Sequence, residues 1–321
     1  MEKIRIAEII SATGGVLLSG NTNDTISSVC IDSRKIEKNC LFVPLTGERE
    51  DGHDFIKDAF KLGASVSFVQ ADHENKDISG ALIEVKCTLT ALQYLAKYYR
   101  SKFSIPIIGI TGSVGKTTTK EMLAAALGEN LNVLKTEGNY NSQATLPLTV
   151  FGLESTHDVA IIEMGVSEFG EMDRLADIAD INIGVITNIG LSHIENFKSM
   201  ENTCNEKLKM MKRSDGVFYL NGDLPLLADA KNKVKQKIIY FGINGNYSFK
   251  CEDIYSNNKV TSFTLVTPEF REPVTIPCLG MHNVYNALAA IAVAKGMGLH
   301  LEDIKKGLLK FKNIKMRQQI S

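Results

Sequence analysis

The sequence has 321 residues, of which 44% are hydrophobic and 23% are charged, and its formal net charge at pH 7 is −1. This length predicts two or three domains, and the balanced charge argues against general attraction to nucleic acid or to an anionic membrane. No apolar run reaches the roughly 18 residues of a membrane span, so we expect a cytoplasmic protein without membrane insertion. The six cysteines lack C-x-x-C spacing and therefore indicate neither a zinc site nor a disulfide framework.

Short apolar strands alternate with helical segments in the N-terminal region. "CLFVPL" and "VSFVQ" have the composition of strands, and "HDFIKDAFKLGA" has that of a helix. The polar turn "TGEREDGHD", residues 46–54, is a candidate binding loop on the surface. We expect an N-terminal domain over residues 1–100, because a helix over 89–99 ends shortly before Pro106 opens a new apolar strand.

The remainder of the chain predicts a central α/β domain over residues 101–315. Its apolar runs are separated by helical stretches, which is typical of a mainly parallel sheet covered on both faces. These runs are "IIGI", "NVLKT", "DVAIIEMG", "INIGVITNIG", "DGVFYLNG" and "KIIYFGI". After about Gly245 the strands alternate apolar with polar residues and predict an antiparallel annex, with helices over 282–297 and 301–311.

The stretch "IPIIGITGSVGKTTTKEM", residues 105–122, is typical of a P-loop, a phosphate-binding turn. An apolar strand, a glycine-rich turn and a helix would direct backbone N–H groups and the positive helix end at one point. Lys116 would reach the outer phosphates of a nucleotide, and Thr117 would offer its hydroxyl to Mg²⁺. Ile110 stands where the first glycine of the common pattern would fall, so this is a variant, and tight packing is the alternative interpretation.

Polar side chains follow two further apolar strands. Glu163 comes just after "AII", and Asn188 and His193 follow "VIT". Because ligands bind at the carboxyl ends of parallel strands, these residues are candidates for the same site. Thr117 and Glu163 would suit one Mg²⁺ ion, whereas a capping carboxylate and a structural histidine are the alternative interpretations.

Five segments occur in this order along the chain: "GITGSVGKTTTKEM", "TEGNYNSQATLPLT", "EMGVSEFGEMDRL", "VITNIGLSHIENF" and "GMHNVYNALAAIAVA". Together they resemble the Mur ligase family. The N-terminal "DSRKIEKNCLFVPLTGEREDGHDF" is similar to the UDP-sugar segment of the branch that joins D-alanyl-D-alanine to UDP-N-acetylmuramoyl-tripeptide in peptidoglycan precursor synthesis. The resemblance implies ATP and Mg²⁺ as cofactors, phosphorylation of a carboxylate by ATP, and attack of an amine on the acyl phosphate.

The resemblance also implies roles for individual residues. The implied nucleotide contacts are Gly112, Ser113, Gly115, Lys116, Thr117, Thr118, Asn283 and Arg317. The implied substrate contacts are Ser33, Arg34, Thr46, Gly47, Asn139 and Asn141. Thr117 and Glu163 would bind one Mg²⁺, while His193 and a carbamylated Lys207 would serve a second. The implied catalytic residues are Lys116, Lys207 and His193.

The sequence departs from the family pattern in two places. A motif usually of the form K-x-K-x-E appears as Asn205, Lys207 and Lys209, so a lysine stands where an acid is usual. Residues 142–145 also differ, so substrate contacts could differ with them. Lys207 as one more solvated lysine is the alternative interpretation of its segment.

Family members carry a third, C-terminal domain, and residues 316–321 would be the start of the linker to it. We therefore expect the 321-residue form to bind nucleotide weakly and to turn over poorly or not at all. A monomer is the default expectation. Two alternative functions stay open at this point: a related Mur-type ligase with another substrate, and a non-catalytic module that binds a nucleotide or a UDP-sugar.

Overall fold

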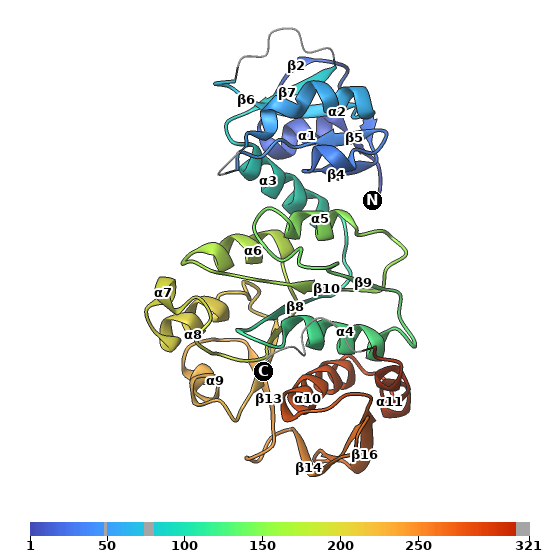
Figure 1. Cartoon of the computed structure of the whole chain (residues 1–321), viewed down its shortest axis with the longest axis vertical. Coiled ribbons are helices and arrows are strands. Elements are labelled where there is room, and N and C mark those ends of the chain that lie inside the picture. Colours follow the sequence, from blue (N-terminus) through green and yellow to red (C-terminus); the bar gives the residue numbers. More distant parts are fainter. Residues whose placement is uncertain (48–49, 74–79, 313–321) are drawn as a thin grey trace. The chain divides into compact units, whose positions relative to one another are not determined.

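The computed structural model describes residues 1–47, 50–73 and 80–312 (Figure 1). The chain divides into two compact units, Met1–Ser104 with Gln143–Ser155, and Ile105–Ser142 with the chain from Thr156 onward. The sequence analysis assigns residues 143–155 to the central domain, whereas the structure groups this segment with the first unit. Its helix α5 (Leu146–Phe151) packs against α3 (Thr88–Arg100), and the Tyr99 hydroxyl donates a hydrogen bond of 2.6 Å to the Leu153 carbonyl.

The first unit is built on a five-stranded sheet in which β4 to β7 are parallel and β2 is an antiparallel edge strand. The predicted strands are confirmed, because β5 and β6 lie inside "CLFVPL" and "VSFVQ". In spatial order the strands are β2 (Val16–Ser19), β7 (Ala81–Val85), β6 (Val66–Gln70), β5 (Cys40–Phe42) and β4 (Ser28–Cys30). The remaining elements are β1 (Ile4–Arg5), α1 (Ile6–Thr13), β3 (Thr25–Ile26), η1 (Ser33–Lys35), η2 (Gly52–Phe55) and α2 (Ile56–Leu62).

The second unit is built on a nine-stranded sheet, which confirms the predicted α/β class with a mainly parallel sheet. The antiparallel strands β14 to β16 extend this sheet at one edge, because β14 pairs in parallel with β13. In spatial order the strands are β16 (Arg271–Ile276), β15 (Thr261–Val266), β14 (Phe249–Ser256), β13 (Lys237–Gly242), β12 (Val217–Asn221), β11 (Ile183–Ile186), β8 (Ile107–Thr111), β10 (Val159–Glu163) and β9 (Val133–Lys135).

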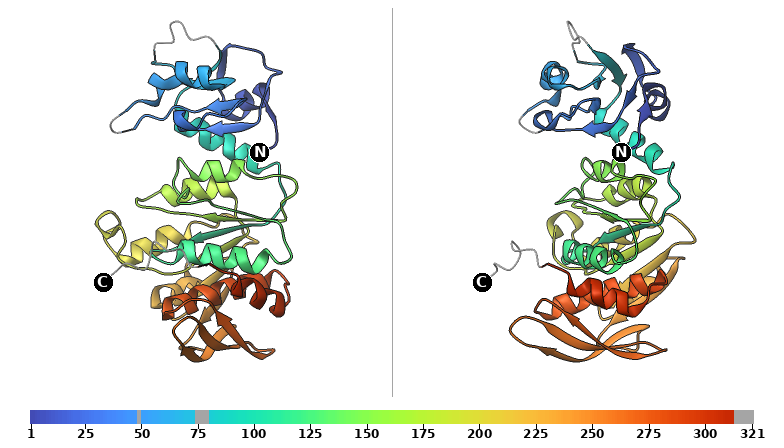
Figure 2. Two further views of the ribbon diagram at one scale, coloured as in Figure 1. Left: turned by 45° about the vertical axis from the view of Figure 1, so that its right-hand side comes forward. Right: turned by 90° about the vertical axis from the view of Figure 1, so that its right-hand side faces the viewer.

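Helices cover both faces of the central strands, and Figure 1 shows α6 and α4 on opposite sides of β8 and β10. On the α4 face, α10 and α11 pack beside α4 (Figure 2). Gly307 of α11 permits this close packing, since a Cβ there would lie 2.1 Å from the Ala125 carbonyl oxygen of α4. The helices are α4 (Lys116–Leu127), α6 (Glu171–Ala179), α7 (Ile194–Phe197), α8 (Met200–Leu208), α9 (Pro225–Ala228), η3 (Asp229–Asn232), α10 (Met281–Gly296) and α11 (Leu301–Leu309).

The register of the sheet brings several strand ends to one edge. Glu163 pairs with Ile110, and Ile186 pairs with both Thr111 and Leu220. These strands are parallel, so their carboxyl ends open on the same side, where ligand sites form in folds of this class. In the part of the chain that the structure describes, no helix combines the length and the apolarity needed to cross a bilayer.

The core between α4, α10 and the sheet provides a first prediction. Leu288 of α10 is fully buried in that core, so Leu288→Ala should lower the free energy of unfolding by about 2–5 kcal/mol, through lost burial and an unfilled cavity. Urea unfolding followed by circular dichroism measures this change. Leu309→Ala is the matched control, because Leu309 is 55% exposed. Equal losses in the two variants would contradict the assignment of the core.

Candidate active site

The turn between β8 and α4 has the backbone of a phosphate-binding loop. β8 is fully buried and ends at Thr111, and α4 begins at Lys116, which confirms the predicted strand, turn and helix. Gly112 and Gly115 have φ values of +150° and +86°. A Cβ on Gly112 would also lie 2.1 Å from the Thr187 hydroxyl oxygen, so glycine is needed for both the conformation and the close approach. The turn therefore meets the positive end of α4, a place that favours an anion.

The segment that follows β11 supports this P-loop. The Ser113 N–H donates to the Asn188 carbonyl at 3.0 Å, and the Gly190 N–H donates to the Ser113 hydroxyl at 2.9 Å. The Thr187 hydroxyl donates to the Val114 carbonyl at 2.6 Å. The sequence analysis places Asn188 at a strand end beside the P-loop, and these hydrogen bonds confirm that the two segments are neighbours.

Glu163, the last residue of β10, is almost fully buried below the P-loop. The Thr117 hydroxyl donates to its Oε2 at 2.9 Å, and the Asn141 amide donates to its Oε1 at 2.9 Å. The ammonium of Lys120, itself buried, lies 3.9 Å from Oε2. Hydroxyl and carboxylate oxygens are the donors that Mg²⁺ prefers, so Thr117 and Glu163 fit the predicted ion.

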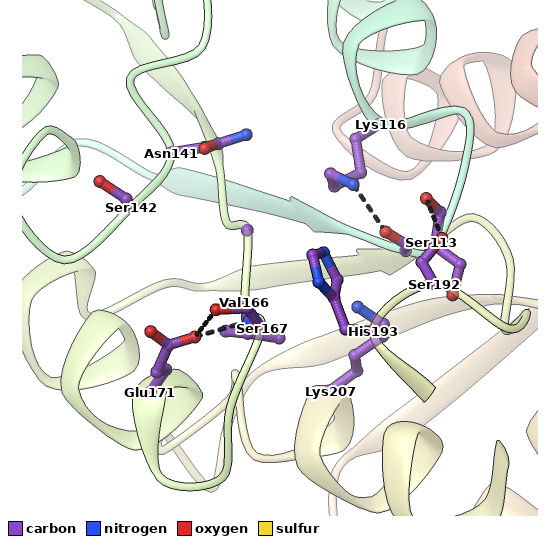
Figure 3. A pocket seen from close by; sticks show the side chains of 12 residues that line it. Ser113, Lys116, Asn141, Ser142, Val166, Ser167, Glu171, Ser192, His193 and Lys207 are labelled. Carbon is purple, nitrogen blue, oxygen red and sulfur yellow. Dashed lines mark hydrogen bonds between the residues drawn. The ribbon is translucent and has the colours of Figure 1, made fainter. Parts of the chain in front are cut away.

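A cavity of about 260 Å³ opens beside the P-loop, and we call it the phosphate-side pocket. Figure 3 shows Lys116, His193 and Lys207 pointing into it from three different segments. The Lys116 ammonium donates to the Gly112 carbonyl at 2.8 Å. The lining residues are Gly112, Ser113, Lys116, Asn141, Ser142, Gly165, Val166, Ser167, Glu171, Ser192, His193 and Lys207.

Lys207 is buried rather than solvated, which rules out the alternative interpretation of its segment. Its side chain extends from α8, and the residue is 3% exposed. Burial, together with the nearby positive charge of Lys116, lowers the pKa of the Lys207 amine from 10.5 to about 8. Within the described ranges this amine has no hydrogen bond or ion pair. An ammonium does not fit a metal site, but a carbamate on the same nitrogen would supply oxygen ligands.

A second cavity of about 700 Å³ lies on the other side of the P-loop, and we call it the helix-side pocket. It shares Ser113 and Lys116 with the phosphate-side pocket. One ligand could therefore reach from one cavity to the other across the P-loop. The lining residues are Ser113, Val114, Gly115, Lys116, Thr118, Thr187, Asn188, Asn221, Asp223, Leu224, Asn244, His282, Tyr285 and Asn286.

The wall of the helix-side pocket is held by Asp223. Its carboxylate accepts hydrogen bonds from the Tyr285 and Tyr247 hydroxyls at 2.8 and 3.0 Å, and from the N–H groups of Ile243 and Asn244 at 2.6 and 3.0 Å. Burial alone would raise the pKa of Asp223, but these hydrogen bonds stabilise the carboxylate and lower the pKa below its ordinary value. Asp223 is therefore an ionised, rigidly held group at the edge of this cavity.

Among the described residues of the second unit that the sequence predicts to contact nucleotide or substrate, Thr117, Asn139 and Asn283 line neither pocket. Asn139 is exposed. Asn283 is buried in α10, where its amide donates to the Leu279 carbonyl at 2.8 Å, and its neighbours in the helix line the helix-side pocket instead. Arg317 lies outside the described residues.

The predicted UDP-sugar residues lie in the first unit. The exposed guanidinium of Arg34 in η1 forms hydrogen bonds of 2.8 and 2.9 Å with the carboxylate of Asp32. Thr46 pairs with Asp51 in an isolated bridge, and the Gly47 N–H donates to the Glu50 carbonyl at 2.9 Å. These contacts bring Thr46 and Gly47 next to Glu50 and Asp51. The roles of these residues and of Ser33 in substrate binding stay predictions.

The sequence analysis missed several lining residues. Ser167 and Glu171 lie within the quoted "EMGVSEFGEMDRL", and a carboxylate at the first position of a helix was the available signal. Asp223 follows the strand "VFYLN", so the rule about strand ends applied to it as well. Tyr285 had no signal, because only the packing of α10 brings it to Asp223.

The fold and the site place the chain in the class of P-loop α/β proteins. A family model described as "Mur ligase middle domain" matches residues 110–294, and a model described as "Mur ligase family, catalytic domain" matches residues 25–100. The chain belongs to the Mur ligase family, as the resemblance of its motifs predicts.

Relatives and solved structures make the similarity more specific. The chain is 39% identical to the UDP-N-acetylmuramoyl-tripeptide–D-alanyl-D-alanine ligase of Bacillus subtilis (strain 168), over all of this chain and 70% of that protein. A crystal structure of MurF from Acinetobacter baumannii is similar with a TM-score of 0.91 and 31% identity, over 98% of this chain and 70% of that one. MurF from Thermotoga maritima in complex with ADP has a TM-score of 0.80 and 26% identity, over 89% and 66% of the two chains.

The lowered pKa of Lys207 leads to a second prediction. Only the neutral amine reacts with an acylating reagent, so the acetylation rate of Lys207 should reach half of its maximum near pH 8, the value to which burial lowers the pKa. Acetic anhydride pulses at pH 6–10, read by mass spectrometry, measure this rate. Exposed Lys259 is the control. A Lys207 profile that matches the Lys259 profile would contradict the prediction.

Proposed function

We propose that this chain acts in peptidoglycan precursor synthesis as an ATP-dependent ligase that joins D-alanyl-D-alanine to UDP-N-acetylmuramoyl-tripeptide. The observation that carries the proposal is that Lys116 lines both the phosphate-side and the helix-side pocket. A nucleotide in the larger cavity would then present its last phosphate to a substrate in the smaller one. The Bacillus subtilis relative bears the name of this ligase, and the Thermotoga maritima structure holds ADP.

The reaction implied by the family has two steps. A carboxylate oxygen of the tripeptide attacks the γ-phosphorus of ATP, and ADP leaves. The amine of D-alanyl-D-alanine then attacks the carbonyl carbon of the acyl phosphate, loses a proton and displaces inorganic phosphate. The first step brings two anions together, so its barrier depends strongly on the positive charge at the meeting point.

Lys116 would supply that charge at the junction of the two pockets. Its position at the start of α4 adds the positive end of the helix dipole to the ammonium charge. A Mg²⁺ ion held by Thr117 and Glu163 would neutralise further negative charge on the phosphates. Asn141 and Lys120 would keep the Glu163 carboxylate oriented toward that ion.

Lys207 and His193 would complete the phosphate-side pocket as catalytic residues. Carbamylation requires a neutral amine, and the pKa of about 8 leaves part of Lys207 neutral near pH 7. The carbamate would bear a negative charge and two oxygens, and would serve a second Mg²⁺ together with His193. We also propose that Ser33, Arg34, Thr46 and Gly47 contact the UDP part of the substrate, and that the protein is a cytoplasmic monomer.

Nucleotide binding provides the third prediction. Lys116→Ala should weaken the binding of a non-hydrolysable ATP analogue by about 10- to 100-fold, because an ammonium bonded to phosphate oxygens is lost. Isothermal titration calorimetry with Mg²⁺ measures the dissociation constant. Lys259→Ala is the matched control, since this exposed lysine lines neither pocket. Unchanged affinity in Lys116→Ala would remove the basis of the proposal.

The fourth prediction concerns the reaction itself. ADP release should require UDP-N-acetylmuramoyl-tripeptide and D-alanyl-D-alanine together, and Lys116→Ala should abolish it. A coupled ADP assay with each substrate omitted in turn measures this requirement, and its rate also tests the expected poor turnover of the 321-residue form. ADP release that required a folate instead of UDP-N-acetylmuramoyl-tripeptide would favour the alternative of a related Mur-type ligase with another substrate. Nucleotide binding without any release would favour a non-catalytic module.

A further inference from the structure

Glu206 has a fully buried carboxylate that the proposed reaction does not use. Its Oε1 accepts hydrogen bonds from the Gly170 and Met172 N–H groups at 2.8 and 3.1 Å. Its Oε2 accepts a hydrogen bond of 2.7 Å from the Lys209 ammonium. Three donors thus compensate a charge that would be very unfavourable if it were buried alone.

The contact with Gly170 and Met172 joins two helices. Gly170 is the residue that precedes α6, and its φ of +81° turns the chain into that helix. Glu206 lies on α8, so its carboxylate caps the N-terminus of α6 from a different segment of the chain. Lys209 strengthens the link, because it also forms an ion pair of 3.3 Å with Asp173 in the first turn of α6.

The capped end of α6 belongs to a wall of the phosphate-side pocket, residues 165–171, which we call the wall segment. Within it, the Glu171 carboxylate accepts hydrogen bonds from the Ser167 and Glu168 N–H groups at 2.6 and 3.0 Å. The turn is therefore closed on itself, as Figure 3 shows for Ser167 and Glu171. Toward α8, this segment is held by the hydrogen bonds from Gly170 and Met172 to Glu206, and toward α7 by the Asn196 amide, which donates to the Ser167 carbonyl at 3.0 Å.

Glu206 and Lys207 are consecutive residues on α8, and consecutive side chains on a helix point about 100° apart. Glu206 accordingly points toward α6, while Lys207 points into the phosphate-side pocket. One turn of α8 therefore carries both the Glu206 carboxylate, which binds the wall segment, and the Lys207 amine, which enters the phosphate-side pocket. That turn therefore provides one of the contacts that set the separation of these two sides of the cavity.

We propose that Glu206 is a positioning residue, which with Lys209 holds the wall segment against α8 and so sets the width of the phosphate-side pocket for the terminal phosphate of ATP. The identity of the ligand rests on the proposed function, whereas the contact between Glu206 and α6 does not depend on it. It also explains the lysine at 209, where the family pattern has an acid. The acid is supplied one helical turn earlier by Glu206, and Lys209 is its partner.

Two variants separate this role from simple stabilisation. Glu206→Ala removes both the cap and the ion pair, whereas Glu206→Gln keeps an oxygen that can accept from the N–H groups of α6. Lys212→Met is the matched control, because Lys212 forms an ion pair with Asp173 and, among the described residues, no hydrogen bond or ion pair with Glu206 or the wall segment. All measurements are made on folded protein at a temperature well below the unfolding midpoint of each variant.

Amide hydrogen exchange is the first measurement. In Glu206→Ala, the Gly170 and Met172 amides should exchange about tenfold faster or more, since each loses a hydrogen bond to a charged group. Glu206→Gln should restore most of the protection, and Lys212→Met should leave it unchanged. Unchanged exchange at these amides in Glu206→Ala would overturn the proposal whatever the nucleotide does.

The second measurement is the ratio of affinities for a non-hydrolysable ATP analogue and for ADP, both with Mg²⁺. Because in the proposed function only the terminal phosphate would reach the phosphate-side pocket, Glu206→Ala should lower this preference by about threefold or more, and Glu206→Gln should recover it. Faster exchange with an unchanged ratio would reduce Glu206 to a structural cap and overturn the positioning role. An unmutated chain that bound neither nucleotide would count against the proposed function, and the exchange result would still decide the role of Glu206.

Discussion

The close approach of the P-loop to the segment after β11 is the constraint on which the site depends. At Gly112 the backbone lies so near to the Thr187 hydroxyl that no Cβ fits, and this contact fixes the direction in which the turn enters α4. The direction of α4 then decides where Lys116 and Thr117 stand. Both pockets and the oxygen pair that suits Mg²⁺ are consequences of that one approach.

The electrostatics of the site depend on how deeply each charged side chain is buried and on which groups lie beside it, and not on the number of charged residues. Glu163 is buried, but a hydroxyl, an amide and a buried ammonium lie around it. Lys207 is also buried, no described residue forms a hydrogen bond or ion pair with its amine, and the nearby charge of Lys116 lowers its pKa further. A carboxylate surrounded by hydrogen-bond donors thus lies beside the P-loop, while an amine whose pKa is lowered by burial lines the phosphate-side pocket.

Helices α6 and α8, which follow β10 and β11 in the chain, help to hold the walls of the phosphate-side pocket. The start of α6 and the end of α8 lie beside the phosphate-side pocket. The contact between the two helices involves the carboxylate of Glu206, which is fully buried. The lysine at position 209, which appears anomalous in the sequence, has two acidic partners in the structure. A departure from a family motif can thus preserve the local charge balance through a residue one turn away.

Local sequence determined the strands and helices of this protein. The spacing of the apolar residues, the positions of the glycines and the P-loop pattern are all properties of residues that are neighbours in the chain. It also determined that Glu163 ends a strand and that Lys116, Thr117 and His193 lie in segments that follow strands, and hence that these residues could share one site. Tertiary structure alone decided that α5 packs with the first unit, that Asn283 is buried and lines neither pocket, and that Glu206 caps α6. These features depend on contacts between segments distant in the chain, and such contacts are set by how the helices pack on the sheet and not by any short pattern.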